Sequence, residues 1–298
     1  MANRPIFRTF ESAPYYLTTE IEFDWVKGMA LSQQQKRVIA LHDAFHYRFP
    51  DKQILEISSK SSEAHGIDAS AFNLKKFVPS LGKSVSVENI YQGSKVFEQG
   101  GPFTDILEKT SKEAKGDERL KNSGPLIAFR FENCDYPLNP KNIFYDFLYI
   151  SALMENEELA EKIKQYDAFS DIAFNPQKST NCQARAAAIF VSLSRLGKLD
   201  EVKDFQSFAA LFKLKNITPV ETAKRSLPIL KVSAVVQDHA PVSSEQTVGK
   251  GDIIEHLFFK TGEVLSDPCD GSIRVLFATV GEKKLSYSWV LQNCKIIR

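Results

Sequence analysis

A glutamate, a glutamine and a lysine follow one another at a spacing that brings their side chains onto one side of a helix. Glu88, Gln92 and Lys95 occupy positions i, i+4 and i+7 of a pattern with 3.6 residues per turn. A carboxylate in such a place can take up or release a proton, and a neighbouring ammonium group can hold an anion. The same stripe also fits an ordinary solvated helix face, so the surrounding elements must distinguish the two interpretations.

The flanking residues predict a short helix that presents Glu88 in its first turn. Serines at positions 84 and 86 can cap its start, and Gly100-Gly101 predicts its end. The apolar residues Val87, Ile90 and Tyr91 adjoin the polar stripe, which indicates that part of the helix is buried. We therefore expect a polar wall backed by a hydrophobic core.

Strands and longer helices follow on both sides of this segment. Residues 7 to 25 contain strand-like pieces, and further strand patterns lie at 54–58 and 126–131. Helical patterns cover residues 143–165, 181–196 and 201–213. This mixture predicts an α+β fold in which helices predominate.

The N-terminal region also predicts a helix that begins near Ser32. The spacing of Ser32 and Gln35 is typical of a capping box, and Val38, Leu41, Phe45 and Phe49 form its apolar face. Histidines at 42 and 46 flank that face at i, i+4. Such a pair could bind a metal, but the pattern lacks the glutamate of a His-Glu-x-x-His motif, so we expect no metal site.

Several segments of the chain occur in an order that resembles the NADAR superfamily of N-glycosidases. Residues 88–95 read Glu-Asn-Ile-Tyr-Gln-Gly-Ser-Lys and are similar to the family's glutamate helix, Glu-His-Tyr-x-Gln-Ala-x-Lys. Upstream, residues 69–74 are similar to its Leu-Ser-Asn-Phe element. Downstream, residues 111–115, 145–159 and 181–196 resemble its small-x-x-x-Ala-Lys turn, its amphipathic helix and its closing helix. This ordered set spans about residues 54 to 200.

Within the superfamily, the likeness is greatest to the antitoxins encoded beside DarT-type DNA guanine ADP-ribosyltransferase toxins. It is carried by residues 55–61, 91–98, 144–149 and 181–185. The resemblance implies an antitoxin ADP-ribosylglycohydrolase that hydrolyses the N-glycosidic bond of ADP-ribosylated guanine in DNA. The implied partners are the modified DNA, as a single-stranded or flipped nucleotide, and the cognate toxin. No cofactor or metal is implied.

The sequence departs from the family pattern at three places. Asn89 stands where a histidine is usual, Tyr136 lies near the position of the family's active-site tryptophan, and an Asp-x-Trp-Gly element is absent between Asp171 and Asn181. The second catalytic acid is therefore not fixed by the motifs. Asp171 is the nearest carboxylate, with Asp167 behind it.

The resemblance and the chemistry of the bond together define a candidate site. Cleavage passes through an oxocarbenium-like state, which needs negative charge near the anomeric carbon and a group that moves a proton. Glu88 and Asp171 are the candidate catalytic residues. The candidate substrate-binding residues are Lys60, Ser70, Phe72, Asn73, Tyr91, Gln92, Lys95, Tyr136, Asn181 and Arg185.

Several of these residues have a structural interpretation beside the functional one. Arg185 and Lys60 could bind the phosphates or form surface contacts, with Arg185 in a salt bridge. Tyr136 could stack on a base or pack in the core. A lysine near the ribose could instead attack it and form a Schiff base. Two other functions also fit: an N-glycosidase for a riboflavin-pathway ribosyl-amine intermediate, and an antitoxin that only binds its toxin.

Composition favours a globular protein of the cytoplasm. The 298 residues include 38 Lys plus Arg against 37 Asp plus Glu, so a global positive field of the kind that non-specific DNA binders use is excluded. No apolar run is long enough for a membrane helix, and none opens the chain. The cysteines at 134, 182, 269 and 294 are scattered, which indicates reduced thiols rather than disulfides or a zinc site.

The chain is predicted to fall into three stretches. Residues 1–215 form a mainly helical NADAR (YbiA-like) domain with an N-terminal extension, and the proline-containing stretch 216–249 forms a connecting segment. Residues 250–298 alternate with period two and contain an Asp270-Gly271 turn, which predicts a small SH3-like or Tudor-like β-barrel. This part resembles the Tudor-like domain of UvrD-type helicases, and we expect it to bind a protein or nucleic-acid partner.

Overall fold

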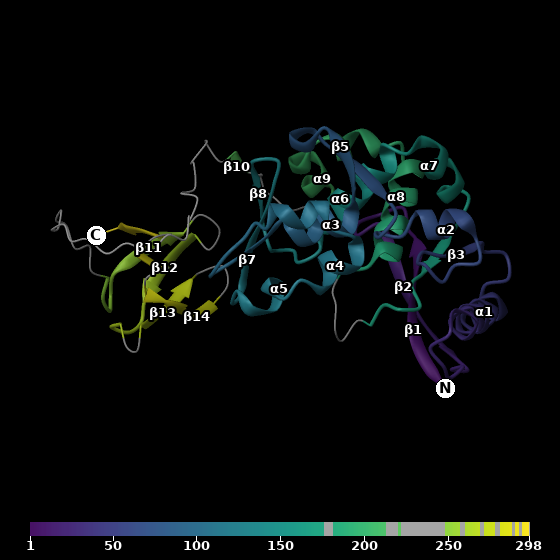
Figure 1. Cartoon of the computed structure of the whole chain (residues 1–298), viewed down its shortest axis with the longest axis horizontal. Helices are drawn as coiled ribbons and strands as arrows, with labels where there is room; N and C mark the ends of the chain where they lie inside the picture. Colours follow the sequence, from purple (N-terminus) through teal and green to yellow (C-terminus); the bar gives the residue numbers. More distant parts are fainter. Residues whose placement is uncertain are drawn as a thin grey trace. The chain divides into compact units, whose positions relative to one another are not determined.

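The fold was analysed in a computed structural model. It describes residues 1–175, 181–212, 220–221, 248–256, 260–268, 271–277, 281–287, 290–291 and 294–297. The chain divides into two compact units, Met1–Arg225 and Ser226–Arg298. Both units contain β-sheet, and the long α-helices of the described residues all belong to the first unit (Figure 1). The expected α+β class is therefore confirmed, whereas the predicted connecting segment 216–249 lies outside the described residues apart from 220–221 and 248–249.

A four-stranded sheet of order β2-β1-β9-β3 forms one layer of the first unit. β1 (Ala2–Thr9) and β2 (Tyr16–Phe23) are an antiparallel hairpin, and β9 (Ala168–Ser170) pairs antiparallel with β1. β3 (Ile54–Glu56) runs parallel to β9. Because β9 ends at Ser170, this pairing fixes where the chain enters Asp171.

Helix α1 (Leu31–Arg48) packs on this sheet through the predicted apolar face. Its N-cap is Ala30, whose side chain makes no capping bond. The predicted capping box is wrong because the helix begins before Ser32. His42 Nε2 lies 2.8 Å from Ser170 Oγ, and His46 Nε2 lies 3.2 Å from the carbonyl oxygen of Lys52.

The first unit also contains two further sheets and several short helices. β4 (Lys75–Val78) and β5 (Lys83–Ser86) pair with each other around η1 (Pro79–Leu81). The second four-stranded sheet has the order β10-β8-β7-β6. Its strands are β6 (Lys95–Phe97), β7 (Leu126–Phe131), β8 (Cys134–Tyr136) and β10 (Val220–Glu221). The short helices are α2 (Ala64–Asp68), α3 (Val87–Gly93), η2 (Thr104–Glu108), α4 (Ser111–Gly116) and α5 (Arg119–Asn122).

The predicted long helices are present with different bounds. The helical pattern at 143–165 forms α6 (Ile143–Met154) and α7 (Glu157–Ile163). They are separated where the Asn156 side chain donates to the carbonyl oxygens of Ala152 and Lys75. Such local bonds compete with helix continuation. α8 (Gln183–Arg195) agrees with the prediction, and the pattern at 201–213 forms η3 (Leu199–Lys203) and α9 (Phe205–Leu211).

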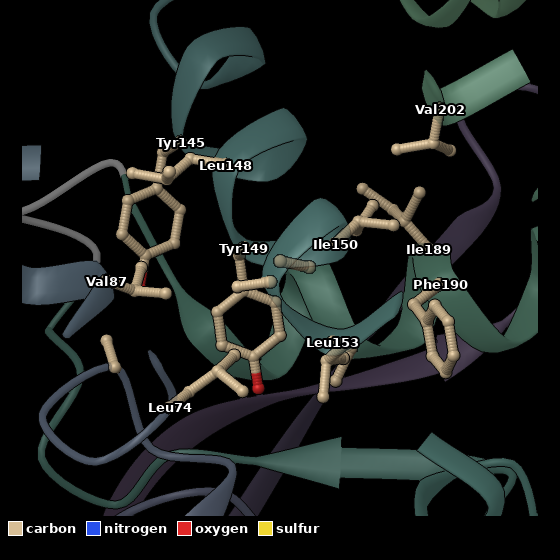
Figure 2. Close-up of a cluster of buried hydrophobic side chains, with 14 of the residues drawn as sticks. Leu74, Val87, Tyr145, Leu148, Tyr149, Ile150, Leu153, Ile189, Phe190 and Val202 are labelled. Carbon is tan, nitrogen blue, oxygen red and sulfur yellow. The ribbon is translucent and has the colours of Figure 1, made fainter. Parts of the chain in front are cut away.

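The main hydrophobic core lies between α6 and α8. Tyr149, Leu153 and Phe190 are fully buried, and Figure 2 shows them with neighbouring side chains from both helices. Tyr149 keeps its hydroxyl satisfied by donating to the carbonyl oxygen of Ala69 at 2.7 Å. The core therefore anchors the segment that follows α2, which leads into the candidate site. No helix among the described residues has the length and apolar character needed to cross a bilayer.

The C-terminal unit is an open antiparallel sheet of order β14-β13-β12-β11-β15. Its strands are β11 (Ile253–His256), β12 (Lys260–Val264), β13 (Ser272–Phe277), β14 (Gly281–Ser286) and β15 (Cys294–Ile297). The predicted strands are thus confirmed, but the closed barrel is not, since no pairing joins β14 to β15 in the part described. Alternation sets which side chains face inward, whereas closure needs pairing between the two outer strands. Asp270 of the predicted turn lies outside the described residues.

Candidate active site

Helix α3 carries one wall of the site and is shorter than the sequence predicts. Ser86 caps the start of the helix, because its Oγ accepts a hydrogen bond from the backbone N–H of Asn89 at 3.2 Å. Gly93 ends it at a point where an added Cβ would lie 2.4 Å from Leu107 Cδ1. The predicted end at Gly100-Gly101 is wrong because the chain continues from Ser94 into β6, whose first residue pairs with Phe129 of β7.

Lys95 therefore belongs to a strand, yet it still joins the polar stripe. Gln92 Nε2 donates to Glu88 Oε1 at 2.9 Å, and Lys95 Nζ donates to Gln92 Oε1 at 2.6 Å. The Lys95 ammonium also lies 4.9 Å from the centre of the Tyr91 ring. One amide thus connects a buried carboxylate, only 6% exposed, to an ammonium group. Both polar groups of that amide, its NH₂ and its oxygen, therefore form hydrogen bonds.

Burial weakens the hold of Lys95 on its proton. Desolvation lowers the pKa of Lys95 to about 8, with Lys115 acting in the same direction and Glu88 opposing it. The side chain is consequently charged below about pH 8 and neutral above it. Any anion bound beside Lys95 gains this charge only in the lower range.

Another part of the site begins directly after β9, at Asp171. Its Oδ1 accepts from the Ala173 amide and its Oδ2 from Gln183 Nε2, each at 3.0 Å. Burial, together with the nearby Glu56 carboxyl, raises the pKa of Asp171 to about 7. Gln183 also donates to the Ile57 carbonyl and accepts from the Ala71 amide. Asp171 is therefore held by two donors, one of which, Gln183, is itself fixed by Ile57 and Ala71, and it can carry a proton near neutrality.

These parts of the site line a cleft of about 380 Å³. Most of the predicted site residues line it: Lys60, Ser70, Phe72, Glu88, Tyr91, Gln92, Lys95, Asp171 and Asn181. Asn181 Nδ2 donates to the hydroxyl of Tyr91, which ties the start of the α8 segment to α3. The tertiary structure thus brings together residues from five stretches of the chain, between positions 60 and 181.

Three predicted substrate-binding residues do not line this cleft. Tyr136 is buried against Phe144, with ring centres 4.5 Å apart, so it is a packing residue. Arg185 forms a buried ion pair with Asp146 at 2.9 Å. It lies two residues beyond Gln183, about 200° around the helix, and so faces away from the cleft. Asn73 donates to the Ile67 carbonyl at 3.0 Å beside a different surface hollow.

The sequence prediction also missed residues that line the cleft. Lys115 of α4 is the most informative, because its Nζ lies 5.3 Å from the centre of the exposed Phe72 ring. It gives the cleft a third lysine, with Lys60 and Lys95. Its position in the motif at 111–115 was the available signal. Other missed lining residues are Ser58, Ser59, Ala71, Tyr145, Ala173, Phe174, Asn175 and Gln183.

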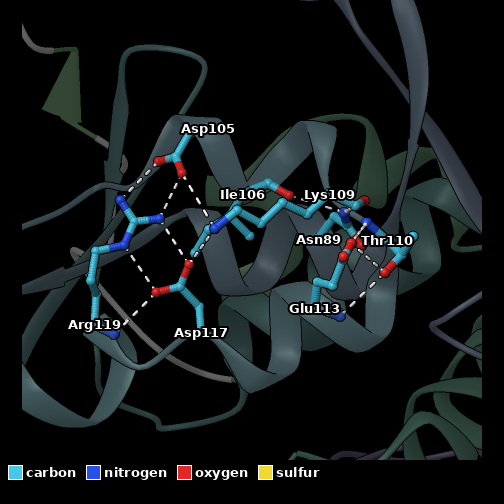
Figure 3. A network of polar contacts seen from close by, with 8 residues as sticks. All are labelled: Asn89, Asp105, Ile106, Lys109, Thr110, Glu113, Asp117 and Arg119. Atoms are coloured by element: carbon cyan, nitrogen blue, oxygen red, sulfur yellow. Dashed lines mark hydrogen bonds and ion pairs between the residues drawn. The ribbon is translucent and has the colours of Figure 1, made fainter.

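Asn89, which stands where a histidine is usual, joins α3 to the chain at residues 106–109. Its Nδ2 donates to the carbonyl oxygens of Ile106, at 3.0 Å, and Lys109, at 2.5 Å. Figure 3 shows this contact beside the network in which Asp105 and Asp117 bind Lys109 and Arg119. Asn89 therefore positions the helix that carries Glu88 and is not part of the cleft lining.

The comparisons with known proteins agree with the motifs in this unit. A family model described as NADAR-DarT1, DarT1-associated NADAR antitoxin, matches residues 2–222. A search of curated proteins gave no match. The matched range contains the residues that line the cleft, and the C-terminal sheet lies beyond it.

Proposed function

The chain belongs to the DarT1-associated NADAR antitoxin family, and from this membership we propose that it is an enzyme that removes ADP-ribose from guanine in DNA. The family implies a DarT-type toxin as its counterpart. The proposed reaction is hydrolysis of the N-glycosidic bond between the ribose and the guanine amine. It would reverse the modification that the toxin makes.

The observation that carries this proposal is that Glu88 and Asp171 both line one cleft. Glycoside hydrolysis uses two carboxyl groups in different protonation states. Glu88 accepts a hydrogen bond from Gln92, which suits a carboxylate that stabilises positive charge at the anomeric carbon and takes a proton from water. Asp171, with its pKa raised to about 7, suits the acid that protonates the departing nitrogen.

The lysines of the cleft fit the diphosphate of an ADP-ribosyl group. Lys60, Lys95 and Lys115 all line it, and ammonium groups form strong hydrogen bonds with phosphate oxygens. A volume of about 380 Å³ lies within the usual range for small-molecule sites. Recognition of the ADP-ribose rather than of a DNA sequence agrees with the near-neutral charge of the chain.

In the proposed substrate, the ADP-ribose is joined to the exocyclic amine of guanine. Such an adduct occupies the pairing edge of the base, so the modified nucleotide is already partly unpaired. Extrusion of an unpaired base costs less than extrusion of a paired one. We therefore propose a single-stranded or flipped nucleotide as the substrate.

Incubation of the purified chain with an oligonucleotide that carries ADP-ribosylated guanine tests the proposal directly. We expect free ADP-ribose and unmodified DNA, read by mass, without added metal. An oligonucleotide with ADP-ribosylated thymine serves as the matched control and should stay intact. If the guanine adduct stays unchanged at saturating protein, the proposed enzymatic activity is refuted.

Two other outcomes would point to the remaining candidate functions. Tight binding of the toxin without hydrolysis would indicate a binding-only antitoxin. Cleavage of a riboflavin-pathway ribosyl-amine, with the DNA adduct left intact, would indicate the other N-glycosidase.

A further inference from the structure

A buried carboxyl group, Glu56, lies behind Asp171 and takes no part in lining the cleft. Its Oε1 accepts from Ser58 Oγ at 2.5 Å and from the Ile172 amide at 2.9 Å, and its Oε2 accepts from Ser170 Oγ at 2.5 Å. Glu56 is 1% exposed and stands opposite Ser170 in the parallel pairing of β3 with β9. It therefore binds the residues on both sides of Asp171 in the sequence.

The hydrogen bonds around Glu56 define where the protons lie. The single hydroxyl proton of Ser170 goes to Glu56, so the contact between Ser170 Oγ and His42 Nε2 requires an N–H on that nitrogen. Burial and the neighbouring His46 lower the pKa of His42 to about 4, which keeps the imidazole neutral. Ser58 Oγ accepts from the Lys60 amide and likewise gives its proton to Glu56.

Every group that contacts Glu56 through a hydrogen bond in this arrangement is a donor, which favours its carboxylate form. Burial raises the pKa of Glu56, and the three hydrogen bonds together with Lys60 oppose that rise. Two nearby carboxyl groups in one poorly hydrated region resist being ionised together. Asp171 receives two neutral donors, fewer than Glu56, and so is the better place for the shared proton.

Other titratable groups also act on Asp171 or respond to its charge. They are Lys115 on α4, Tyr145 and Tyr149 on α6, and Cys182 before α8. Lys115 favours the ionised carboxylate. The tyrosines and the cysteine are neutral near pH 7, because burial raises the pKa of each above its usual range. Glu56 is therefore the neighbouring charge that favours a protonated Asp171.

We propose that Glu56 is a positioning residue that keeps Asp171 protonated as the proton donor of the cleft, and that α1 supports it through His42 and Ser170. The role of Asp171 as donor rests on the proposed function. As the bond from the anomeric carbon to the guanine nitrogen breaks, its electron pair stays on nitrogen and the Asp171 proton moves there. Water adds to the carbon and loses a proton to Glu88.

The test compares the natural chain with Glu56→Gln, which keeps the size of the side chain and removes its charge. Titration of the Asp171 carboxyl carbon by ¹³C NMR, in protein labelled at aspartate, reads the proton directly. The signal is assigned by its loss in Asp171→Asn. The dependence of kcat/KM on pH is measured in parallel with the guanine-modified oligonucleotide.

We expect the Asp171 titration to move to lower pH in Glu56→Gln. An acid must be protonated to act, so the alkaline fall in kcat/KM should move with it. The ratio of kcat/KM at pH 6 to that at pH 8 should rise about five-fold, as a fall of roughly one pH unit from a midpoint near 7 requires. Ser170→Ala, which removes one donor to Glu56, should shift the titration less but in the same direction.

A matched control is Glu20→Gln, since Glu20 is an exposed carboxylate on β2 of the same sheet and its removal should change neither curve. An unmoved Asp171 titration, or an equal loss of kcat/KM at all pH values, would overturn the proposal. Circular dichroism shows whether Glu56→Gln folds. If it does not, Ser170→Ala is used instead, and a shifted or unshifted Asp171 titration in that variant decides the proposal. If the natural chain proves inactive, the NMR titration still tests the link between Glu56 and Asp171, and only the proposed function fails.

Discussion

The unit Met1–Arg225 buries charged side chains, whereas the C-terminal sheet keeps the charged side chains that are described on its surface. Arg37, Glu56, Glu88, Asp146 and Arg185 are all less than 9% exposed in the first unit. In the second unit, the buried residues described are apolar side chains such as Ile254, Val275 and Phe277, apart from a glycine. Their charged neighbours along the strands, such as Arg274, point to solvent.

This difference separates a unit that holds buried charges from one whose described strands alternate apolar and polar side chains. A buried charge costs free energy unless it is paired and hydrogen-bonded. Groups whose pKa is displaced in this way gather at functional sites more often than elsewhere. The cleft residues Lys95 and Asp171 fit that pattern. In the described part of the C-terminal sheet, burial raises the pKa of the Cys294 thiol to about 12, but no charged side chain is buried. We therefore expect this sheet to contribute binding and not catalysis.

The largest effect should follow from removing the charge of Glu88. Glu88→Gln keeps the size of the side chain but eliminates proton transfer and the negative charge near the ribose. General acid-base groups contribute about 10²- to 10⁴-fold, and we predict a loss of kcat of that order in the release of ADP-ribose. Binding of free ADP-ribose, measured by calorimetry, should stay nearly unchanged. Normal turnover by this variant would transfer the catalytic role to another group, with Asp171 tested next.

Breaking the buried ion pair of Asp146 and Arg185 should strongly destabilise the first unit. Asp146→Asn leaves the guanidinium, 2.9 Å away, buried without its countercharge, which typically costs about 3–5 kcal/mol. Urea unfolding followed by fluorescence measures the loss. The matched control is Glu282→Gln in the second unit, which breaks an exposed pair with Arg274 and should cost less than about 1 kcal/mol. Equal losses would show that the contrast between the units has no energetic basis.

Lys95→Met should weaken ADP-ribose binding and change its dependence on pH. Because the pKa of Lys95 is lowered to about 8, the natural chain should lose affinity as the pH rises through that value. The variant should bind about ten-fold more weakly at pH 7, the equivalent of roughly 1.4 kcal/mol. Its affinity should also no longer fall as the pH rises through 8. Calorimetry at several pH values provides the measurement. Lys112→Met, at an exposed position of α4, is the control. It should keep both the affinity of the natural chain and its fall in affinity near pH 8.

The smallest effect on catalysis should come from deleting residues 242–298. The cleft belongs to the first unit, so hydrolysis of a short modified oligonucleotide should stay within a few-fold of the full chain. Rescue of cells from the toxin should weaken if the C-terminal sheet recruits a partner. A large fall in the thermal midpoint together with lost hydrolysis would instead show that this sheet stabilises the first unit.

Local sequence patterns predicted much of the fold. The apolar face of α1, the helix at 183–195 and the alternation in β13 follow from periodicity, which depends only on neighbours in the chain. The bounds were less predictable. Helix α3 ends at Gly93 because Leu107 packs there and β6 pairs with β7, and these contacts come from distant segments.

The sequence by itself determined the stripe of Glu88, Gln92 and Lys95 and the order of segments that resembles the NADAR family. Spacing along one helix and motif order are local properties, and both can be read from the chain. Only the tertiary structure decided that Asp171 lines the same cleft as this stripe, that Arg185 pairs with Asp146, and that Glu56 binds the two residues beside Asp171. Those relations depend on the parallel pairing of β3 with β9 and on the packing of α8, which bring together residues more than a hundred positions apart.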